Sequence, residues 1–115
     1  MKVSQDNYYV YIVTNKTRTV LYIGVTNDLP QRIIEHYLND GKPGTFAGKY
    51  RCHFLIYYEE FKYITDAIAR EKELKKWSRD KKHKLIESMN TRWVPLNAEL
   101  FDKWPPRDMY HRKDT

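Results

Sequence analysis

The chain has 115 residues, enough for one compact domain with a modest hydrophobic core. Hydrophobic residues make up 41% of the chain and aromatic residues 15%, and this content favours a folded domain over disorder. The net charge of +6 favours a polyanionic partner such as nucleic acid. Neither a signal segment nor a run long enough to cross a bilayer is present, so we expect a cytoplasmic protein with no membrane partner.

The cysteine and histidine content argues against a fold stabilised by disulfide bonds or by zinc. Cys52 is the single cysteine, so no intrachain disulfide can form, and a reducing compartment fits the chain. The four histidines are scattered and lack zinc-ligand spacing. Stability must therefore come from the hydrophobic core.

Two predicted strands open the chain. Residues 8–14 (YYVYIVT) form an aromatic and β-branched run, which predicts a buried strand. After a polar break at residues 15–18, residues 19–25 predict a second strand. If the break is a tight hairpin turn, Tyr11 faces Tyr22 on one side of the sheet. Such a pair can pack a core or place two hydroxyls in one cleft, and both interpretations stay open.

An amphipathic helix is predicted over residues 29–39. Asp28 and Gln31 form the capping-box pattern at its start. Arg32 and His36 are four residues apart, so they lie on one helix face, toward the polar side. A solvated face is the alternative interpretation of this pair.

The following segment, residues 40–50, holds three of the four glycines and predicts a loop. Residues 44–49 are too short for a phosphate-binding P-loop and lack its Ser or Thr, so we reject a nucleotide site. Lys42 and Lys49 are candidates for contact with a phosphate backbone. Residues 52–59 predict the third strand.

A second long helix is predicted over residues 64–78, with Thr65 or Asp66 as its cap. Glu71 falls in the middle of the apolar stripe of this helix, where a carboxylate is unusual. It either pairs with a basic residue such as Arg32 or faces a cleft and holds a cation. The stripe consists of Ile64, Ala67, Ile68 and Leu74.

Positive charge is concentrated in residues 70–84, where eight Lys or Arg face three acidic residues. Beside the expected cleft, this surplus predicts a phosphate-binding strip. A shorter helix follows over residues 81–89, and we expect a domain over residues 1–96 and a polar C-terminal tail over residues 97–115. The candidate nucleic-acid-binding residues are Lys42, Lys49, Arg70, Lys75, Lys76 and Arg79.

Over about residues 8–90, the chain resembles the GIY-YIG nuclease superfamily. The resemblance is carried by Tyr9-Val10-Tyr11, Tyr22-Ile23-Gly24, Arg32, His36 and Glu71. Within the superfamily, the chain is similar to small stand-alone relatives of the UvrC nuclease domain. The resemblance implies an α/β (α+β) fold with a small three-stranded antiparallel sheet flanked by about three helices.

The resemblance also implies a metal-dependent endonuclease that hydrolyses phosphodiester bonds in DNA, with a link to DNA repair. It implies one Mg²⁺ or Mn²⁺ ion held by Glu71, a phosphate clamp at Arg32, and Tyr11 beside Tyr22. A free phenol with a pKa of about 10 is a poor base at neutral pH, whereas imidazole titrates near neutrality. Tyr22 and His36 are therefore alternative candidates for the base.

Two residues depart from the family pattern. Tyr9 replaces the first glycine, and Val25 stands where several members carry a lysine. These departures motivate a second hypothesis, a nucleic-acid-binding module with little turnover. A protein-interaction domain using the tyrosine-rich surface is a third. The choice between DNA and RNA as substrate stays open at this point, as does the oligomeric state.

Overall fold

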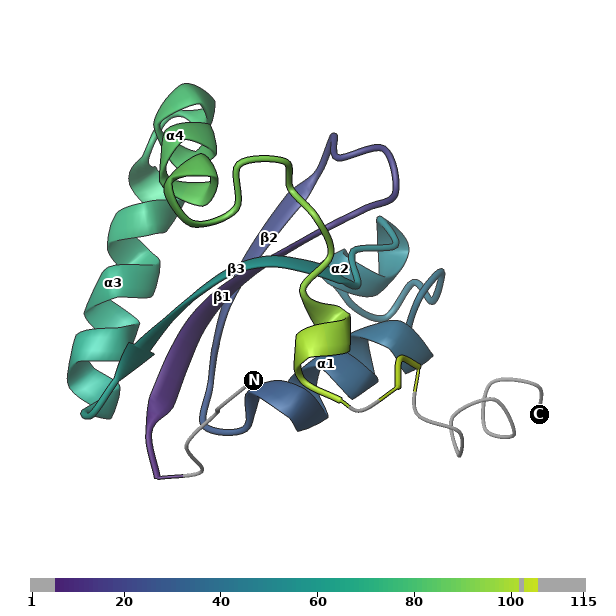
Figure 1. Ribbon diagram of the computed structural model, residues 1–115, viewed down its shortest axis with the longest axis horizontal. Helices are drawn as coiled ribbons and strands as arrows, with labels where there is room; N and C mark the ends of the chain where they lie inside the picture. Colours follow the sequence, from purple (N-terminus) through teal and green to yellow (C-terminus); the bar gives the residue numbers. More distant parts are fainter. Residues whose placement is uncertain (1–5, 102, 106–115) are drawn as a thin grey trace.

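The computed structural model describes residues 6–101 and 103–105. Its centre is a three-stranded antiparallel sheet with strand order β2-β1-β3, so β1 lies in the middle (Figure 1). The strands are β1 (Tyr8–Thr14), β2 (Leu21–Thr26) and β3 (Phe54–Phe61). The predicted three-stranded antiparallel sheet is thereby confirmed.

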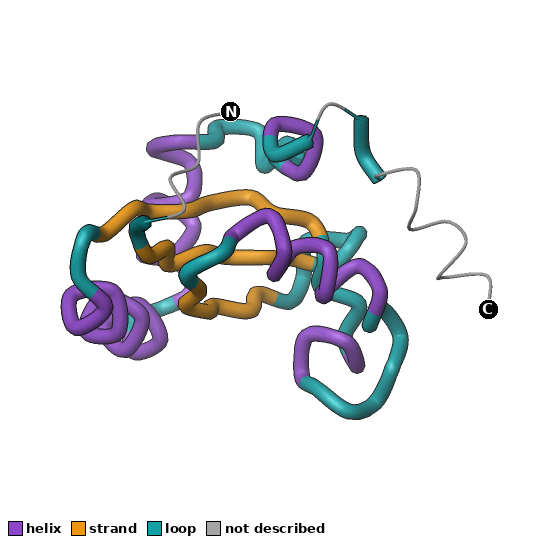
Figure 2. Tube along the Cα trace, turned by 90° about the horizontal axis from the view of Figure 1, so that it is seen from below, coloured by secondary structure: helices purple, strands orange, loops and turns teal. Residues whose placement is uncertain are grey.

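Helices cover both faces of the sheet. In Figure 1, α3 and α4 lie to one side of the strands, and α1 and α2 lie to the other. Figure 2 shows the same strands as a central layer with helices on both sides. The helices are α1 (Leu29–Leu38), α2 (Phe46–Lys49), α3 (Ile64–Lys76), α4 (Arg79–Met89) and a short 3₁₀ helix, η1 (Asn97–Glu99).

Each face of β1 contributes to its own hydrophobic cluster, because successive strand residues point to opposite faces. Tyr9, Tyr11 and Val13 are buried with Leu29 and Ile33 of α1. Their neighbours on the other face are buried beneath α3 and α4, in a cluster that includes Val10, Ile12, Ala67, Leu74 and Ile86. Burial on both faces explains why β1 is a continuous apolar run.

The β1–β2 register differs from the expected one by two residues. Tyr11 lies opposite Gly24, and the expected direct pairing with Tyr22 is wrong. The connection is longer than a tight turn because the Asn15 side chain stabilises a wider loop, accepting a hydrogen bond from the Thr19 backbone N–H (2.8 Å). Since the shift is even, Tyr11 and Tyr22 still share one sheet face.

One of the two predicted helix caps is confirmed. The Asp28 carboxylate accepts a hydrogen bond from the Gln31 backbone N–H at 3.2 Å, at the start of α1. Helix α3, in contrast, begins after Tyr63 with no side-chain cap, so the expected caps Thr65 and Asp66 are wrong.

Other boundaries also differ from expectation. The predicted loop over residues 40–50 contains α2, which begins where the Thr45 hydroxyl accepts a hydrogen bond from the Gly48 N–H (3.0 Å). Strand β3 starts and ends two residues later than predicted. Ile64 and Ile68, expected in the buried stripe of α3, are exposed.

The chain remains attached to the core beyond residue 96. The Asn97 side chain is buried, accepts a hydrogen bond from the Leu55 N–H and donates one to the His53 carbonyl, both at 2.8 Å. Leu100 and Trp104 pack against the same core. The expected tail thus begins with an ordered segment, while residues 106–115 lie outside the described part. Among the described helices, none has the length and apolar character needed to cross a bilayer.

Candidate active site

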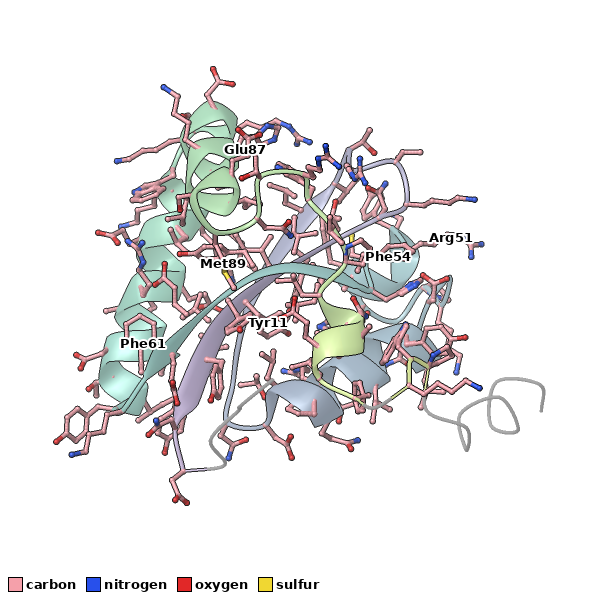
Figure 3. The ribbon with its side chains drawn as sticks, viewed as in Figure 1. Tyr11, Arg51, Phe54, Phe61, Glu87 and Met89 are labelled. Carbon is pink, nitrogen blue, oxygen red and sulfur yellow. The ribbon has the colours of Figure 1, made fainter. Side chains whose placement is uncertain are left out.

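Two tyrosines and one histidine pack together between β2 and α1. The Tyr11 hydroxyl lies 2.8 Å from His36 Nε2, and the two groups share a hydrogen bond. The Tyr22 ring lies 5.4 Å from the His36 ring and 6.4 Å from the Tyr11 ring, measured between centroids. Tyr11 is fully buried in the interior of the molecule (Figure 3). The predicted proximity of the two tyrosines is confirmed.

Gly24 makes room for this arrangement. A Cβ atom at position 24 would lie 2.4 Å from the Tyr11 hydroxyl oxygen, far inside van der Waals contact. The second motif therefore needs glycine because the phenol of the first motif lies across its backbone.

Arg32 precedes His36 by one helical turn. Its Nη1 donates to the Glu35 carboxylate at 3.1 Å, and its side chain is 42% exposed. Its Nε is buried and has no hydrogen-bond partner among the described residues. The pair was expected on the polar side of α1, but His36 instead packs against the tyrosines because α1 rests on the sheet at that turn.

Arg32 also borders an open groove of about 560 Å³ between the β2–α1 connection and the start of α3. Val25 lines this groove. The other lining residues are Tyr8, Thr26, Asn27, Asp28, Gln31, Glu35 and Ile64.

Burial keeps the hydrogen-bonded pair uncharged. Desolvation, aided by the nearby positive charge of Arg32, lowers the pKa of His36 to about 4. Desolvation raises the pKa of Tyr11 above its ordinary value, and the charge of Arg32 only partly offsets this effect. At neutral pH the imidazole is therefore unprotonated and the phenol remains protonated.

Glu71 lies between Ala67 and Leu74 on the side of α3 that faces the sheet, and its side chain is 20% exposed. Its partner is Lys75, whose Nζ lies 3.4 Å from Glu71 Oε2. The expected pairing of Glu71 with a basic residue is therefore confirmed, but the partner is Lys75 and not Arg32, whose guanidinium pairs with Glu35.

Helix α3 packs against β1 and β2. At its start, Ile64 lines the same groove as Val25 near the end of β2. Just beyond its end, Arg79 donates to the Thr19 carbonyl (2.7 Å), ahead of β2. Glu71 lies in the middle of α3, in the layer opposite α1. No interaction among the described residues joins it to Tyr11, Tyr22 or His36.

The predicted basic residues fall into two groups. Arg70 forms a two-pronged ion pair with Glu59, with both N–O distances at 2.9 Å, and also contacts Glu73. Together with Lys75 and Arg79, it is engaged within the protein. Lys42, Lys49 and Lys76 project from the surface.

Sequence reasoning missed Phe46 and Tyr50. The Phe46 ring stacks on Tyr22, with a centroid distance of 6.2 Å and an interplanar angle of 27°. Tyr50 packs against Phe46 at 4.7 Å. Two aromatic residues within a glycine- and lysine-rich segment were the available signal.

The donor set fits one hard divalent cation with few protein ligands. No group of three or more His, Cys, Asp or Glu in the described residues is arranged to hold a metal. Glu71 nevertheless offers a carboxylate with a single lysine partner. Mg²⁺ commonly takes one or two carboxylates and completes its shell with water and phosphate oxygens, so Glu71 suffices.

These side chains on a three-stranded sheet with flanking helices define a nuclease-type fold. The family model described as "GIY-YIG catalytic domain" matches residues 7–84, and the chain belongs to this family. The family supports a nuclease-type hydrolase in general, one that acts on nucleic acid and generally depends on a divalent metal.

Its curated relatives carry the name UPF0213 protein. The chain is 41% identical over 81 residues to the UPF0213 protein of Staphylococcus saprophyticus, covering 70% of this chain and 95% of the relative. It is 37% identical over 82 residues to that of Haloquadratum walsbyi, covering 71% and 89%. The solution NMR structure of the Bacillus halodurans UPF0213 protein matches with a TM-score of 0.50 and 29% identity, covering 80% of this chain and 95% of that one.

Proposed function

We propose that this protein is a metal-dependent endonuclease that hydrolyses phosphodiester bonds in DNA. The observation that carries the proposal is the contact cluster of Tyr11, Tyr22 and His36 beside Arg32, in a chain of the GIY-YIG family. The substrate is drawn to the site by the net charge of +6.

Arg32 binds the scissile phosphate. Its guanidinium borders the open groove and is partly exposed; Nε is buried and Nη1 contacts Glu35, which leaves Nη2 for an anion. A planar fork of N–H donors matches two phosphate oxygens and stabilises the charge that grows on them during hydrolysis.

Tyr22 orients the attacking water, and His36 takes up its proton. Tyr11 is fully buried and stays protonated, so its part is to position His36 through their shared hydrogen bond. The lowered pKa leaves His36 unprotonated at neutral pH but a weak base, and the negative charge of a bound phosphodiester raises that pKa and strengthens the base.

Glu71 would hold the metal, and water and phosphate oxygens would complete its shell. A divalent cation supplies charge neutralisation at the phosphoryl oxygens and lowers the pKa of bound water. Glu71 would exchange its Lys75 partner for the ion, which is feasible because the Lys75 side chain is 53% exposed and can move into solvent.

A nucleic-acid-binding module with little turnover is the second candidate, favoured by the two departures from the family pattern. Tyr9 is buried and donates to Glu60 at 3.0 Å, so it is a packing residue. Val25 leaves one wall of the groove beside Arg32 without a cation. Under this alternative, DNA binding survives Glu71→Gln and no product forms.

The deciding experiment incubates purified protein with Mg²⁺ or Mn²⁺ and a panel of single-stranded, duplex and branched DNA. Wild type cleaves at least one substrate, while Glu71→Gln and Arg32→Met lower the rate by about 10³-fold, as expected for loss of a charge that stabilises the transition state. Glu73→Gln is the matched control on α3 and retains activity. An intact panel, with no detectable metal binding, would overturn the proposal.

A further inference from the structure

A second groove, of about 410 Å³, lies beside the candidate active site (α2 and the start of β2 in Figure 1). It is not the groove that Arg32 borders. Two aromatic and two basic side chains line it together with the chain leading into β2. The lining residues are Thr19, Val20, Leu21, Phe46, Tyr50, Arg79 and Lys82.

The aromatic residues of this groove continue the ring cluster of the active site. Tyr22 contacts His36 on one side and stacks with Phe46 on the other. Phe46 then contacts Tyr50. Exposure rises along this path from 0% at Tyr11 to 51% at Phe46, and Tyr50 at its end is 41% exposed. A line of rings thus leads from the buried hydroxyls to solvent.

The exposed rings of Phe46 and Tyr50 leave apolar surface accessible to solvent. The Phe46 face that does not cover Tyr22 has no ring partner among the described residues except Tyr50. The β1–β2 strand pairing and the core packing do not require this exposure. Flat, accessible rings beside a phosphate site are the usual platform for unstacked bases.

The positive charges around this groove also suit a nucleic-acid strand. Lys82 lines the groove and forms no ion pair within the described residues. Arg79 uses Nη2 for the Thr19 carbonyl, which fixes its guanidinium at the groove wall and leaves further donors. Lys49, whose Nζ lies 5.4 Å from the Tyr50 ring centroid, adds a third cation at the rim. These cations suit a backbone that carries phosphates.

We propose that this groove binds a single-stranded DNA segment next to the cleaved phosphate, with one base stacked on Phe46 or Tyr50 and the backbone on Lys82. The inference rests on the proposed nuclease function and narrows its substrate. The preferred DNA would carry unpaired nucleotides beside the scissile bond, as at a flap, a gap or a splayed end. A fully stacked blunt duplex cannot offer a free base to these rings.

The test measures binding without turnover. A fluorescent oligonucleotide of about eight nucleotides, in EDTA, is titrated with wild type, Phe46→Ala, Tyr50→Ala and Lys82→Ala. Losing one stacked base is expected to weaken binding about tenfold for either aromatic variant. Phe46→Trp, which keeps a flat ring, restores it. Tyr63→Ala, at an exposed tyrosine that precedes α3, is the matched control and leaves affinity unchanged.

A base analogue whose fluorescence falls on stacking supplies a second readout. Its signal is quenched by wild type and recovers with Phe46→Ala. Blunt duplex binding, measured in parallel, changes less than twofold. The inference is overturned if both aromatic variants bind single strands as wild type does, if duplex binding weakens equally, or if only an RNA strand of the same sequence responds.

These results separate the groove from the proposed catalysis. Ring-dependent binding without metal-dependent cleavage supports the groove and contradicts the nuclease. Glu71-dependent cleavage with no effect of Phe46→Ala supports the nuclease and contradicts the groove. Thermal unfolding of each variant shows whether a loss of binding comes from misfolding; because Lys82 lies outside the core clusters, its variant carries the test if Phe46→Ala unfolds.

Discussion

Tyr11 lies across the backbone of Gly24 on the neighbouring strand, and its hydroxyl occupies the space that a side chain there would need. The glycine of the second motif and the tyrosine of the first are therefore one structural unit. Their contact directs the phenol to His36 on α1.

Gly24→Ala is expected to displace the Tyr11 ring, because the new Cβ would lie 2.4 Å from its hydroxyl oxygen. Forcing one methyl into this packed site costs about 1–3 kcal/mol of unfolding free energy and lowers DNA cleavage. Chemical denaturation and an activity assay measure both effects. Gly44→Ala is the control, since no atom lies within 4 Å of a Cβ there. Equal behaviour of the two variants would contradict the proposed unit.

His36 is expected to titrate near pH 4 in the folded protein, measured by NMR of the ring protons, because burial and the charge of Arg32 lower its pKa. Arg32→Met should raise this pKa by removing that charge; Glu35 acts in the opposite direction. A His36 pKa at the ordinary value of about 6.5 would contradict the buried, uncharged pair.

The same shift predicts how stability depends on pH. The unfolded chain protonates His36 below about pH 6.5, while the folded chain does so only near pH 4. Between these values the unfolded state binds more protons, so unfolding free energy falls as the pH drops, by at most about 3 kcal/mol. Above pH 6.5 the contribution is constant. His36→Gln should flatten this part of the profile, and an unchanged slope would contradict the assignment.

Asn97→Ala is expected to destabilise the fold by about 2–3 kcal/mol, because it leaves the Leu55 N–H and the His53 carbonyl without their buried partner. A chain ending at residue 96 should unfold at a lower temperature for the same reason. Asn27→Ala, at an exposed position, is the control for thermal unfolding. If Asn97→Ala unfolded at the same temperature as wild type, these two hydrogen bonds would not contribute to stability.

Arg70 and Lys76 are expected to differ although both belong to the basic segment. Arg70→Ala breaks a half-buried, two-pronged ion pair with Glu59 and should cost about 1–3 kcal/mol of stability. Lys76→Ala should leave stability unchanged and reduce the slope of log affinity against log salt by about one phosphate contact. Salt titrations of DNA binding and thermal unfolding separate these effects; identical profiles would contradict the division.

Much of the fold could be predicted from local sequence patterns, because strands and helix caps depend on residues that are close together in the chain. The apolar run of β1 and the Asp28 cap are examples. The register was not predictable from the break alone, since the Asn15 side chain stabilises a longer loop that no turn rule includes. The buried role of Asn97 could not be predicted, because its hydrogen-bond partners lie more than 40 residues earlier in the chain; the sequence alone placed this residue in a polar tail.

In the candidate site, too, local spacing was predictable and contacts between distant segments were not. Spacing on α1 predicted that Arg32 and His36 share a face, but only the docking of α1 on the sheet shows that His36 touches both tyrosines. The stripe of α3 identified Glu71 as anomalous, although its partner, Lys75, lies one turn away on the same helix. Phe46 was missed because a single exposed ring has no periodicity.

The central claim of the proposal is that a metal ion held by Glu71 lies close to the tyrosine–histidine cluster when the substrate is bound. Mn²⁺ broadens the NMR signals of nuclei close to it, so a titration in the presence of a non-cleavable DNA strand tests this claim directly. The account predicts selective broadening of the Tyr22 and His36 ring signals, lost in Glu71→Gln. Broadening confined to other acidic residues, or unchanged by Glu71→Gln, would contradict it.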